Sequence, residues 1–120
     1  MIDKSQRVEI WHRATCSNSR GALQLLREAG IEPVVVDYVN DPPSKARLRQ
    51  AIADAGLSVR AAIRSKEPEY AQQGLDDPAL SDDALLDAML RTPKLINRPF
   101  VFTAKGVRLC RPPETVLTLL

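Results

Sequence analysis

The sequence has no long hydrophobic run and no excess of charge of one sign. No apolar stretch approaches the roughly 20 residues of a membrane-spanning helix, and the first seven residues are mostly polar, without the apolar segment of a secretory signal. The 17 basic residues are nearly balanced by 15 acidic ones, for a formal net charge of +2. We therefore expect neither a membrane nor a nucleic acid as partner, and any affinity for anions must come from a local cluster of charges.

Cysteine is also scarce, since the 120 residues contain only Cys16 and Cys110, far apart in the chain. This is not the disulfide framework of a small secreted protein, so the sequence predicts a reducing, cytoplasmic environment. A hydrophobic content of 44% and a charged content of 27% are those of an ordinary globular protein. The length suffices for one compact domain with a core but not for two, and we expect a single domain over residues 1–120.

The hydrophobic pattern predicts an α/β protein. Apolar runs indicate a strand over 8–11, a helix over 17–29 with Ala22, Leu25, Leu26 and Ala29 on one face, and a second strand over 34–38 buried on both faces. A helix over 44–55 and a helical insert over about 58–91 follow, then a β-hairpin over 100–103 and 107–110, and a closing helix after Pro112. This order is that of a thioredoxin-like fold: a four-stranded mixed sheet with flanking helices and a helical insertion before the third strand. A proline at the start of that strand is often cis in this fold, so we expect a cis Arg98–Pro99 bond.

Cys16 is predicted to lie in the loop between the first strand and the first helix. Ser17 and Ser19 can cap this helix, and Gly30 suits its C-terminal end. The positive end of a helix dipole lowers the pKa of a thiol, and His12 and Arg20 add donors or positive charge nearby in the sequence. The loop therefore predicts a reactive thiolate, with His12 placed to tune it.

The residues after Cys16 form a C-x-x-S motif instead of C-x-x-C. A single thiol cannot close its own disulfide, so its reduction needs a thiol from elsewhere, either a small molecule or a redoxin protein. Cys110 could be that resolving thiol, but it belongs to an apolar strand, where a buried structural cysteine is expected.

Three arginines lie at the ends of predicted elements, where the side chains of this fold can converge on the thiol: Arg64, Arg98 and Arg111. Arginine is always charged, and its planar fork of donors suits tetrahedral oxyanions. Ordinary solvated surface arginines are the competing interpretation of these residues.

Four stretches resemble the glutaredoxin-coupled arsenate reductase family in order and spacing. They are His12-x-x-x-Cys16-x-x-x-Arg20, the segment 52–61 leading to Arg64, Leu95-Ile96-Asn97-Arg98-Pro99, and the segment 106–112 with Arg111. The resemblance implies that Cys16 attacks arsenate and that Arg64, Arg98 and Arg111 bind it. It also places His12 near the thiol, with Ser19 and Arg20 as further candidates.

The resemblance further implies that glutathione and glutaredoxin donate the electrons and that arsenite is the product. Glutathione is then a cosubstrate, with no tightly bound cofactor and no metal. Two alternatives stay open at this point. A redox-sensing regulator similar to the Spx-type factors needs the thiol loop but no oxyanion site, and such sensors commonly carry C-x-x-C. A general glutathione-dependent thiol oxidoreductase needs Cys16 but not the three arginines together.

Overall fold

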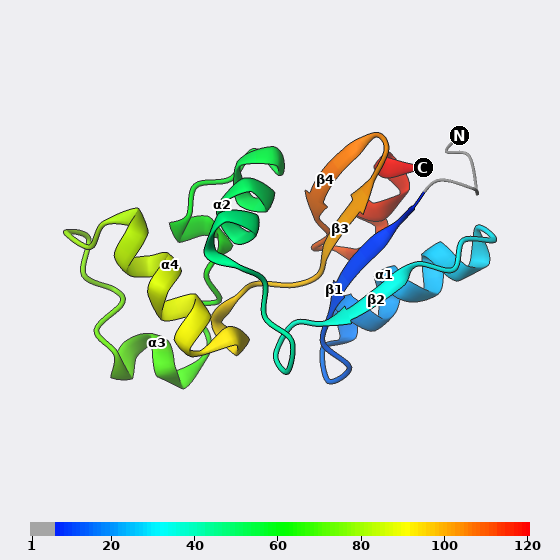
Figure 1. The fold of residues 1–120 in the computed structure, drawn as a ribbon. Coiled ribbons are helices and arrows are strands. Elements are labelled where there is room, and N and C mark those ends of the chain that lie inside the picture. The colour runs from blue at the N-terminus through cyan, green and yellow to red at the C-terminus, as the bar shows by residue number, and fades with distance from the viewer. Residues whose placement is uncertain (1–6) are drawn as a thin grey trace. The chain divides into compact units, whose positions relative to one another are not determined.

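A computed structural model of the protein describes residues 7–120 (Figure 1). The polar N-terminal stretch noted in the sequence lies, apart from Arg7, outside the described residues. The chain forms two compact units. Within the described residues, one unit contains residues 7–41 together with Arg98–Leu120, and the other is Pro42–Asn97.

The first unit is built on a four-stranded mixed sheet. Its elements are β1 (Glu9–His12), α1 (Ser17–Glu28), β2 (Val34–Asp37), β3 (Phe100–Thr103), β4 (Gly106–Leu109) and the 3₁₀ helix η3 (Pro113–Leu119). The strand order is β2-β1-β3-β4. β1 and β2 are parallel, as expected for strands joined through a helix, whereas β3 is antiparallel to both β1 and β4. The predicted mixed sheet and its β-hairpin are confirmed.

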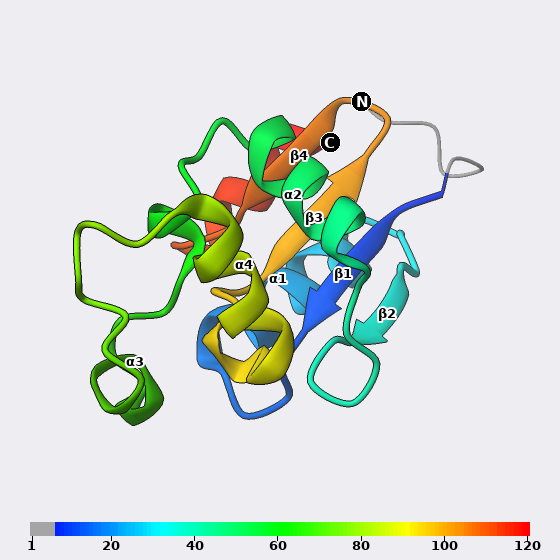
Figure 2. The same ribbon diagram turned by 60° about the vertical axis from the view of Figure 1, so that its left-hand side comes forward.

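α1 and η3 lie on the same face of this sheet (Figures 1 and 2). The core between them and the sheet consists of ten buried residues: Val8, Ile10, Ala22, Leu23, Leu26, Ile31, Val101, Cys110, Val116 and Leu119. On α1 the buried stripe includes Leu23, which the sequence pattern did not select, while Leu25 and Ala29 are only partly buried. The core holds α1, and with it the loop before it, against β1.

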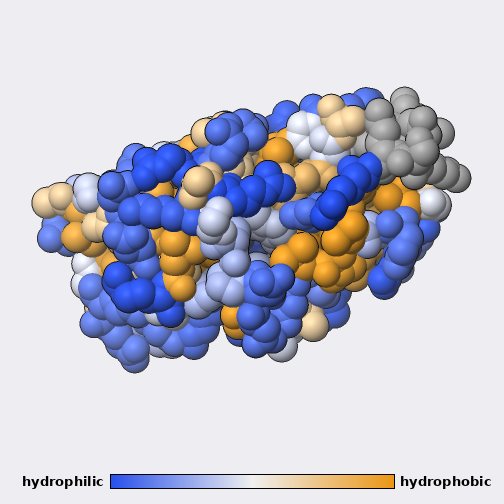
Figure 3. Space-filling view, viewed as in Figure 1, coloured by the Kyte–Doolittle hydropathy of each residue, from blue (hydrophilic) through white to orange (hydrophobic). Residues whose placement is uncertain are grey.

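The prediction that the second strand is buried on both faces is wrong. β2 is an edge strand, and Val34 and Val35 are 43% and 40% exposed. Hydrophobic surface is visible over β2 in Figure 3. A run of β-branched residues indicates a strand but does not say whether a second neighbour covers it, because edge and central strands share this composition.

The start of α1 also differs from the prediction. Cys16 itself is the N-cap residue, and neither Ser17 nor Ser19 caps the helix with its side chain. The hydroxyl of Ser19 is engaged elsewhere, in the site described below. The other end is as predicted, since Gly30 takes the left-handed φ of 81° that a residue after a helix often adopts.

The second unit is helical. It contains α2 (Lys45–Asp54), η1 (Arg60–Ala62), α3 (Pro68–Gln72), α4 (Asp82–Arg91) and η2 (Pro93–Leu95). Ser44 and Ser81 cap α2 and α4, each accepting a backbone N–H bond 3.1 Å long. Arg60 stabilises the irregular segment around α3. Its guanidinium donates to the hydroxyl of Tyr70 and to the carbonyls of Leu75 and Asp77. Within residues 7–120, no helix is long and apolar enough to cross a membrane.

Candidate functional site: a cysteine at the start of α1

Cys16 lies where the chain turns from β1 into α1. Its backbone N–H donates to the carbonyl of Arg13 (2.9 Å), which closes a turn. Its own carbonyl accepts from Arg20 N–H (3.0 Å), the first hydrogen bond of the helix. The side chain is partly exposed. The turn therefore presents the sulfur at the N-terminal end of α1.

The surroundings of Cys16 lower the pKa of its thiol below the ordinary value. Burial is the largest single influence on this pKa and raises it, but four hydrogen bonds together outweigh it. In decreasing order they come from the backbone N–H of Ser19, the Arg111 side chain, the backbone N–H of Asn18 and the Arg98 side chain. Each stabilises the negative sulfur of the thiolate.

Arg98 and Arg111 reach the thiol from the two ends of the β-hairpin. Arg98 precedes β3 and is only 5% exposed, and Arg111 follows β4. Arg111 Nη1 lies 3.8 Å from the sulfur of Cys16 and donates to the carbonyl of Arg98 (2.7 Å). The peptide bond that follows each arginine is cis, at Pro99 as predicted and also at Pro112. Two guanidinium groups thus stand beside one thiol.

His12 is joined to the thiol loop through Ser19. Ser19 is fully buried, and its Oγ accepts from the backbone N–H of Arg13 (3.0 Å) and lies 2.6 Å from His12 Nδ1. Which of the two donates depends on the tautomer of the imidazole: when the Ser19 hydroxyl donates to Nδ1, the proton of the neutral ring lies on Nε2. The same residue, Ser19, therefore holds the imidazole with its side chain and supports the thiolate with its backbone.

The pKa of His12 is lowered from its ordinary value. Partial burial is the main cause, and the positive charges of Arg27 and Arg20 lower this pKa further, whereas Asp37 raises it. The imidazole is consequently neutral near pH 7. A neutral ring can donate a hydrogen bond without adding a charge to the site.

Arg64 belongs to the other unit. Its backbone N–H donates to the carbonyl of Leu95 (2.7 Å), and its Nε lies 3.5 Å from a carboxylate oxygen of Glu67. The convergence of Arg64 on Cys16 stays a prediction.

Cys110 is fully buried in the core of the sheet unit, as its apolar strand predicted. Its thiol faces the carbonyl of Arg108 at 3.7 Å. Burial raises the pKa of Cys110 to about 12, with the charge of Arg108 acting in the opposite direction. A thiol with that pKa is protonated at neutral pH and is a poor nucleophile.

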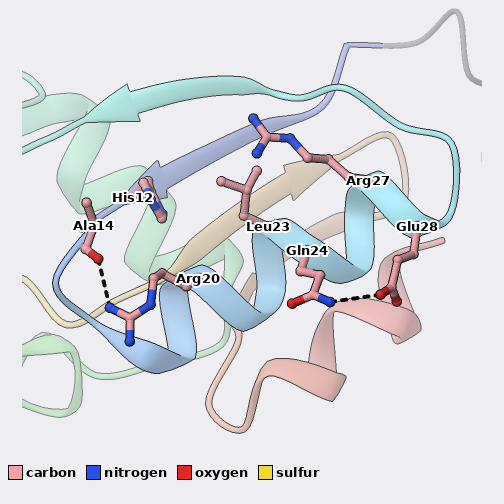
Figure 4. Close-up of a pocket in the computed structure, with 7 residues that line it drawn as sticks. All are labelled: His12, Ala14, Arg20, Leu23, Gln24, Arg27 and Glu28. Atoms are coloured by element: carbon pink, nitrogen blue, oxygen red, sulfur yellow. Dashed lines mark hydrogen bonds between the residues drawn. The ribbon is translucent and has the colours of Figure 1, made fainter.

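A pocket of about 610 Å³ lies along α1 next to His12 (Figure 4). Its lining residues are His12, Ala14, Arg20, Leu23, Gln24, Arg27 and Glu28. Of these, sequence reasoning singled out His12 and Arg20 and missed the rest. The missed signal is the spacing of residues 20, 23, 24, 27 and 28, which share one face of a helix. Among residues 7–120, no three histidine, cysteine, aspartate or glutamate side chains are grouped to hold a metal ion.

This arrangement suits nucleophilic attack on an oxyanion. The thiolate is the nucleophile, and the guanidinium groups of Arg98 and Arg111 lie beside it to offset negative charge on the oxygens of a bound anion. Neutral His12 and the backbone N–H groups at the start of α1 add further donors.

The model of the ArsC family matches residues 11–119 of the chain. An arsenate reductase of Rhizobium meliloti (strain 1021) is 56% identical over 113 residues, covering 94% of this chain and 81% of that protein. An arsenate reductase of Escherichia coli (strain K12) is 44% identical over 113 residues, covering 94% of this chain and 80% of that protein.

Solved structures agree with these sequence matches. The structure of an arsenate reductase from Vibrio cholerae superimposes with a TM-score of 0.92 at 45% identity, covering 96% of this chain and 98% of that one. The predicted thioredoxin-like architecture and the family resemblance are confirmed. With a family model that spans nearly its whole length and relatives this similar, the chain belongs to the ArsC family.

Proposed function

We propose that the protein reduces arsenate to arsenite, with Cys16 as the nucleophile and glutathione and glutaredoxin as electron donors. The relatives named above are arsenate reductases. The observation that carries the proposal is the placement of Arg111 Nη1 3.8 Å from the Cys16 sulfur, with Arg98 bound to Arg111 through its carbonyl. A simple thiol exchange reaction needs the thiolate but not this pair of cations.

In the first step the Cys16 thiolate attacks arsenic, and an S–As bond forms while an As–O bond breaks. The departing oxygen leaves as hydroxide or, after protonation, as water. Arg98 and Arg111 bind the remaining oxygens and stabilise the negative charge that increases as the sulfur approaches. We assign the same task to Arg64, and to neutral His12 a hydrogen bond from Nε2 to the arsenate.

Reduction then requires two external thiols. The glutathione sulfur bonds to arsenic and displaces a second oxygen, which leaves as water with the thiol proton, so that arsenic carries both Cys16 and glutathione. A glutaredoxin thiolate attacks the glutathione sulfur, and the S–As electron pair returns to arsenic, which passes from As(V) to As(III). Glutaredoxin keeps glutathione as a mixed disulfide. Water then replaces Cys16 on arsenic and releases arsenite, which regenerates the thiol. Cys16 has no partner thiol in its C-x-x-S motif, and Cys110 is buried with a pKa raised to about 12, which supports this external route.

Arsenite production from arsenate, glutathione and glutaredoxin tests the proposal. We expect turnover in the wild type, none in Cys16→Ser, and a loss of at least about a hundredfold in kcat/KM in Arg111→Ala, the scale of removing one charge-stabilising donor. Arg108→Ala is the matched control, because Arg108 is exposed on β4. Wild-type protein that is folded and reduced yet makes no arsenite would contradict the proposal, and thiol exchange with a protein mixed disulfide would then be the activity to assay.

A further inference from the structure

Apart from His12, the residues that line the pocket along α1 have no role in the arsenate chemistry described above. Its walls come from α1, from the end of β1 and from the loop between them (Figure 4). A volume of about 610 Å³ lies within the range of sites that hold small organic ligands. Sites of this size usually combine apolar surface with a few polar groups that fix the orientation of the ligand.

The pocket has a positive end and a negative end. At one end Arg20 donates through Nη1 to the carbonyl of Ala14 (2.8 Å), and its other N–H groups make no hydrogen bond within the described part of the chain. At the other end Glu28 accepts from the Gln24 amide (3.0 Å). Leu23 supplies apolar surface between them. The charge of Arg27 is already engaged by Glu32, at 2.9 Å.

The positive end lies on the side of the pocket nearest the thiol. Arg20 is one helical turn after Cys16, and its guanidinium reaches back to Ala14, in the loop that positions Cys16 (Figure 4). His12, which lines the same end, is held by Ser19. A ligand carboxylate at Arg20 would therefore be anchored beside the loop that positions Cys16.

We propose that this pocket binds the small donor thiol of the reaction, a short peptide thiol with a free carboxylate and a free ammonium group, as glutathione has. The carboxylate binds Arg20, the apolar and amide parts lie over Leu23 and Gln24, and the ammonium group points toward Glu28. Residues 20 and 28 are about 12 Å apart along a helix that rises 1.5 Å per residue, and an extended chain of three residues spans about 10 Å. The inference rests on the proposed function, because that function is what requires a small thiol at this place.

Binding is tested first, without any turnover. S-methylglutathione has no free thiol and cannot form a disulfide, so it reports on the pocket alone. Titrated into the wild type, it is expected to shift the NMR signals of the backbone amides of residues 20–28 in a saturable manner. Arg20→Gln should weaken the binding about tenfold, the cost of one charge-assisted hydrogen bond. Signals that do not move at millimolar peptide would overturn the inference.

Kinetics then tests which group of the donor Arg20 contacts. The ethyl ester of the glycine carboxylate of glutathione should have a KM about tenfold higher than glutathione in the wild type. In Arg20→Gln the KM for glutathione should rise by the same factor, and the ester should cause no further increase, because both changes remove the same contact. Glu28→Gln, at an exposed position where the new amide can still bond to Gln24, should raise the KM for glutathione less. Arg108→Gln, away from the pocket, is the matched control.

The outcomes separate the inference from the proposed function. Saturable binding of S-methylglutathione at residues 20–28 without arsenite production would remove the proposed function and leave the peptide site standing. Arsenite production with an unchanged KM for glutathione in both pocket variants would do the reverse. A KM that rises for glutaredoxin alone would mean that the pocket receives the protein partner, and would overturn the assignment to a small thiol.

Discussion

Three separate stretches of the chain stabilise the Cys16 thiolate. The turn from β1 supplies backbone N–H groups of α1, Arg98 comes from the start of β3, and Arg111 comes from the end of β4. Burial opposes them by raising the pKa of Cys16, and the sum lowers that pKa. The reactivity of the thiol therefore depends on the hairpin as much as on the helix.

Arg111→Ala should raise the pKa of Cys16, because it removes a hydrogen bond to the thiolate. The rate of alkylation by iodoacetamide follows the thiolate fraction, so its midpoint should move to higher pH in the variant. Cys110 does not interfere in this assay, since it is buried and its pKa is raised to about 12. Cys16→Ser should abolish the reaction, which checks that one thiol is being measured. An unchanged midpoint would mean that Arg111 does not contact the sulfur in solution.

Cys110→Ser should leave arsenite production unchanged and make the protein less stable. The serine hydroxyl would lie in an apolar core with the carbonyl of Arg108 as its nearest partner, and burying it should cost about 1–2 kcal/mol of unfolding free energy. Urea denaturation measures this loss. If the variant stays folded but cannot turn over, Cys110 is the resolving thiol and the external route is wrong.

Ser19→Ala should destabilise the protein more than a surface substitution does. It leaves the backbone N–H of Arg13 and the ring nitrogen of His12 without their common partner in a partly buried place, at a cost of about 1–3 kcal/mol. Ser17→Ala, two residues earlier and exposed, is the control and should change the stability by less than about 0.5 kcal/mol. Equal effects in urea denaturation would remove the special role of Ser19.

At the scale of elements, the sequence predicts features that depend on neighbouring residues. It does not predict features that depend on contacts between distant parts of the chain. Ser44 and Ser81 cap their helices, and such a cap is a local signal because it needs only the residue and the turn that follows. Ser19 does not cap α1, because its hydroxyl bonds to His12 in the neighbouring strand. Val34 and Val35 are exposed because no further strand pairs with β2 in the described sheet. Neither the bond between Ser19 and His12 nor the edge position of β2 can be recognised from the local periodicity of the sequence.

In the candidate site, too, the sequence predicted the residues that local spacing indicates but not the contacts that depend on tertiary structure. The spacing of Cys16 before a helix and the arginines at element ends pointed to the thiol and to an anion site. The pairing of Arg111 with the carbonyl of Arg98 depends on how β3 and β4 close the hairpin, which residue spacing does not specify. The pocket on α1 was missed because most of its residues are polar, whereas the hydrophobic pattern selects apolar positions.

The caps of the helical unit give a test at this scale. Ser81→Ala removes the side-chain acceptor of the Ala84 N–H at the start of α4, and it should lower the unfolding free energy by about 1 kcal/mol. Ser81→Asp keeps an acceptor and adds a negative charge at the positive end of the helix, so it should retain or exceed the wild-type stability at neutral pH. A loss as large as that of the alanine variant would show that the cap contributes little.

At the scale of the whole molecule, the proposed reaction uses residues from both compact units. Cys16, Arg98 and Arg111 belong to the sheet unit, and Arg64 belongs to residues 42–97. If arsenate binds through all three arginines, the contribution of Arg64 should appear only when arsenate is present. Protection of Cys16 by arsenate against alkylation measures this contribution directly, because the anion covers the sulfur that iodoacetamide attacks.

In Arg64→Ala, the arsenate concentration that halves the rate of Cys16 alkylation should rise at least about tenfold, the loss of one charge-assisted contact to the anion. Arg91→Ala, which removes an exposed arginine at the end of α4 in the same unit, should leave that concentration unchanged and so controls for net charge. Arg111→Ala differs from both, since it should weaken protection and also slow alkylation without arsenate. If Arg64→Ala protects like the wild type, arsenate is bound by the sheet unit alone, and the helical unit has no part in holding the anion.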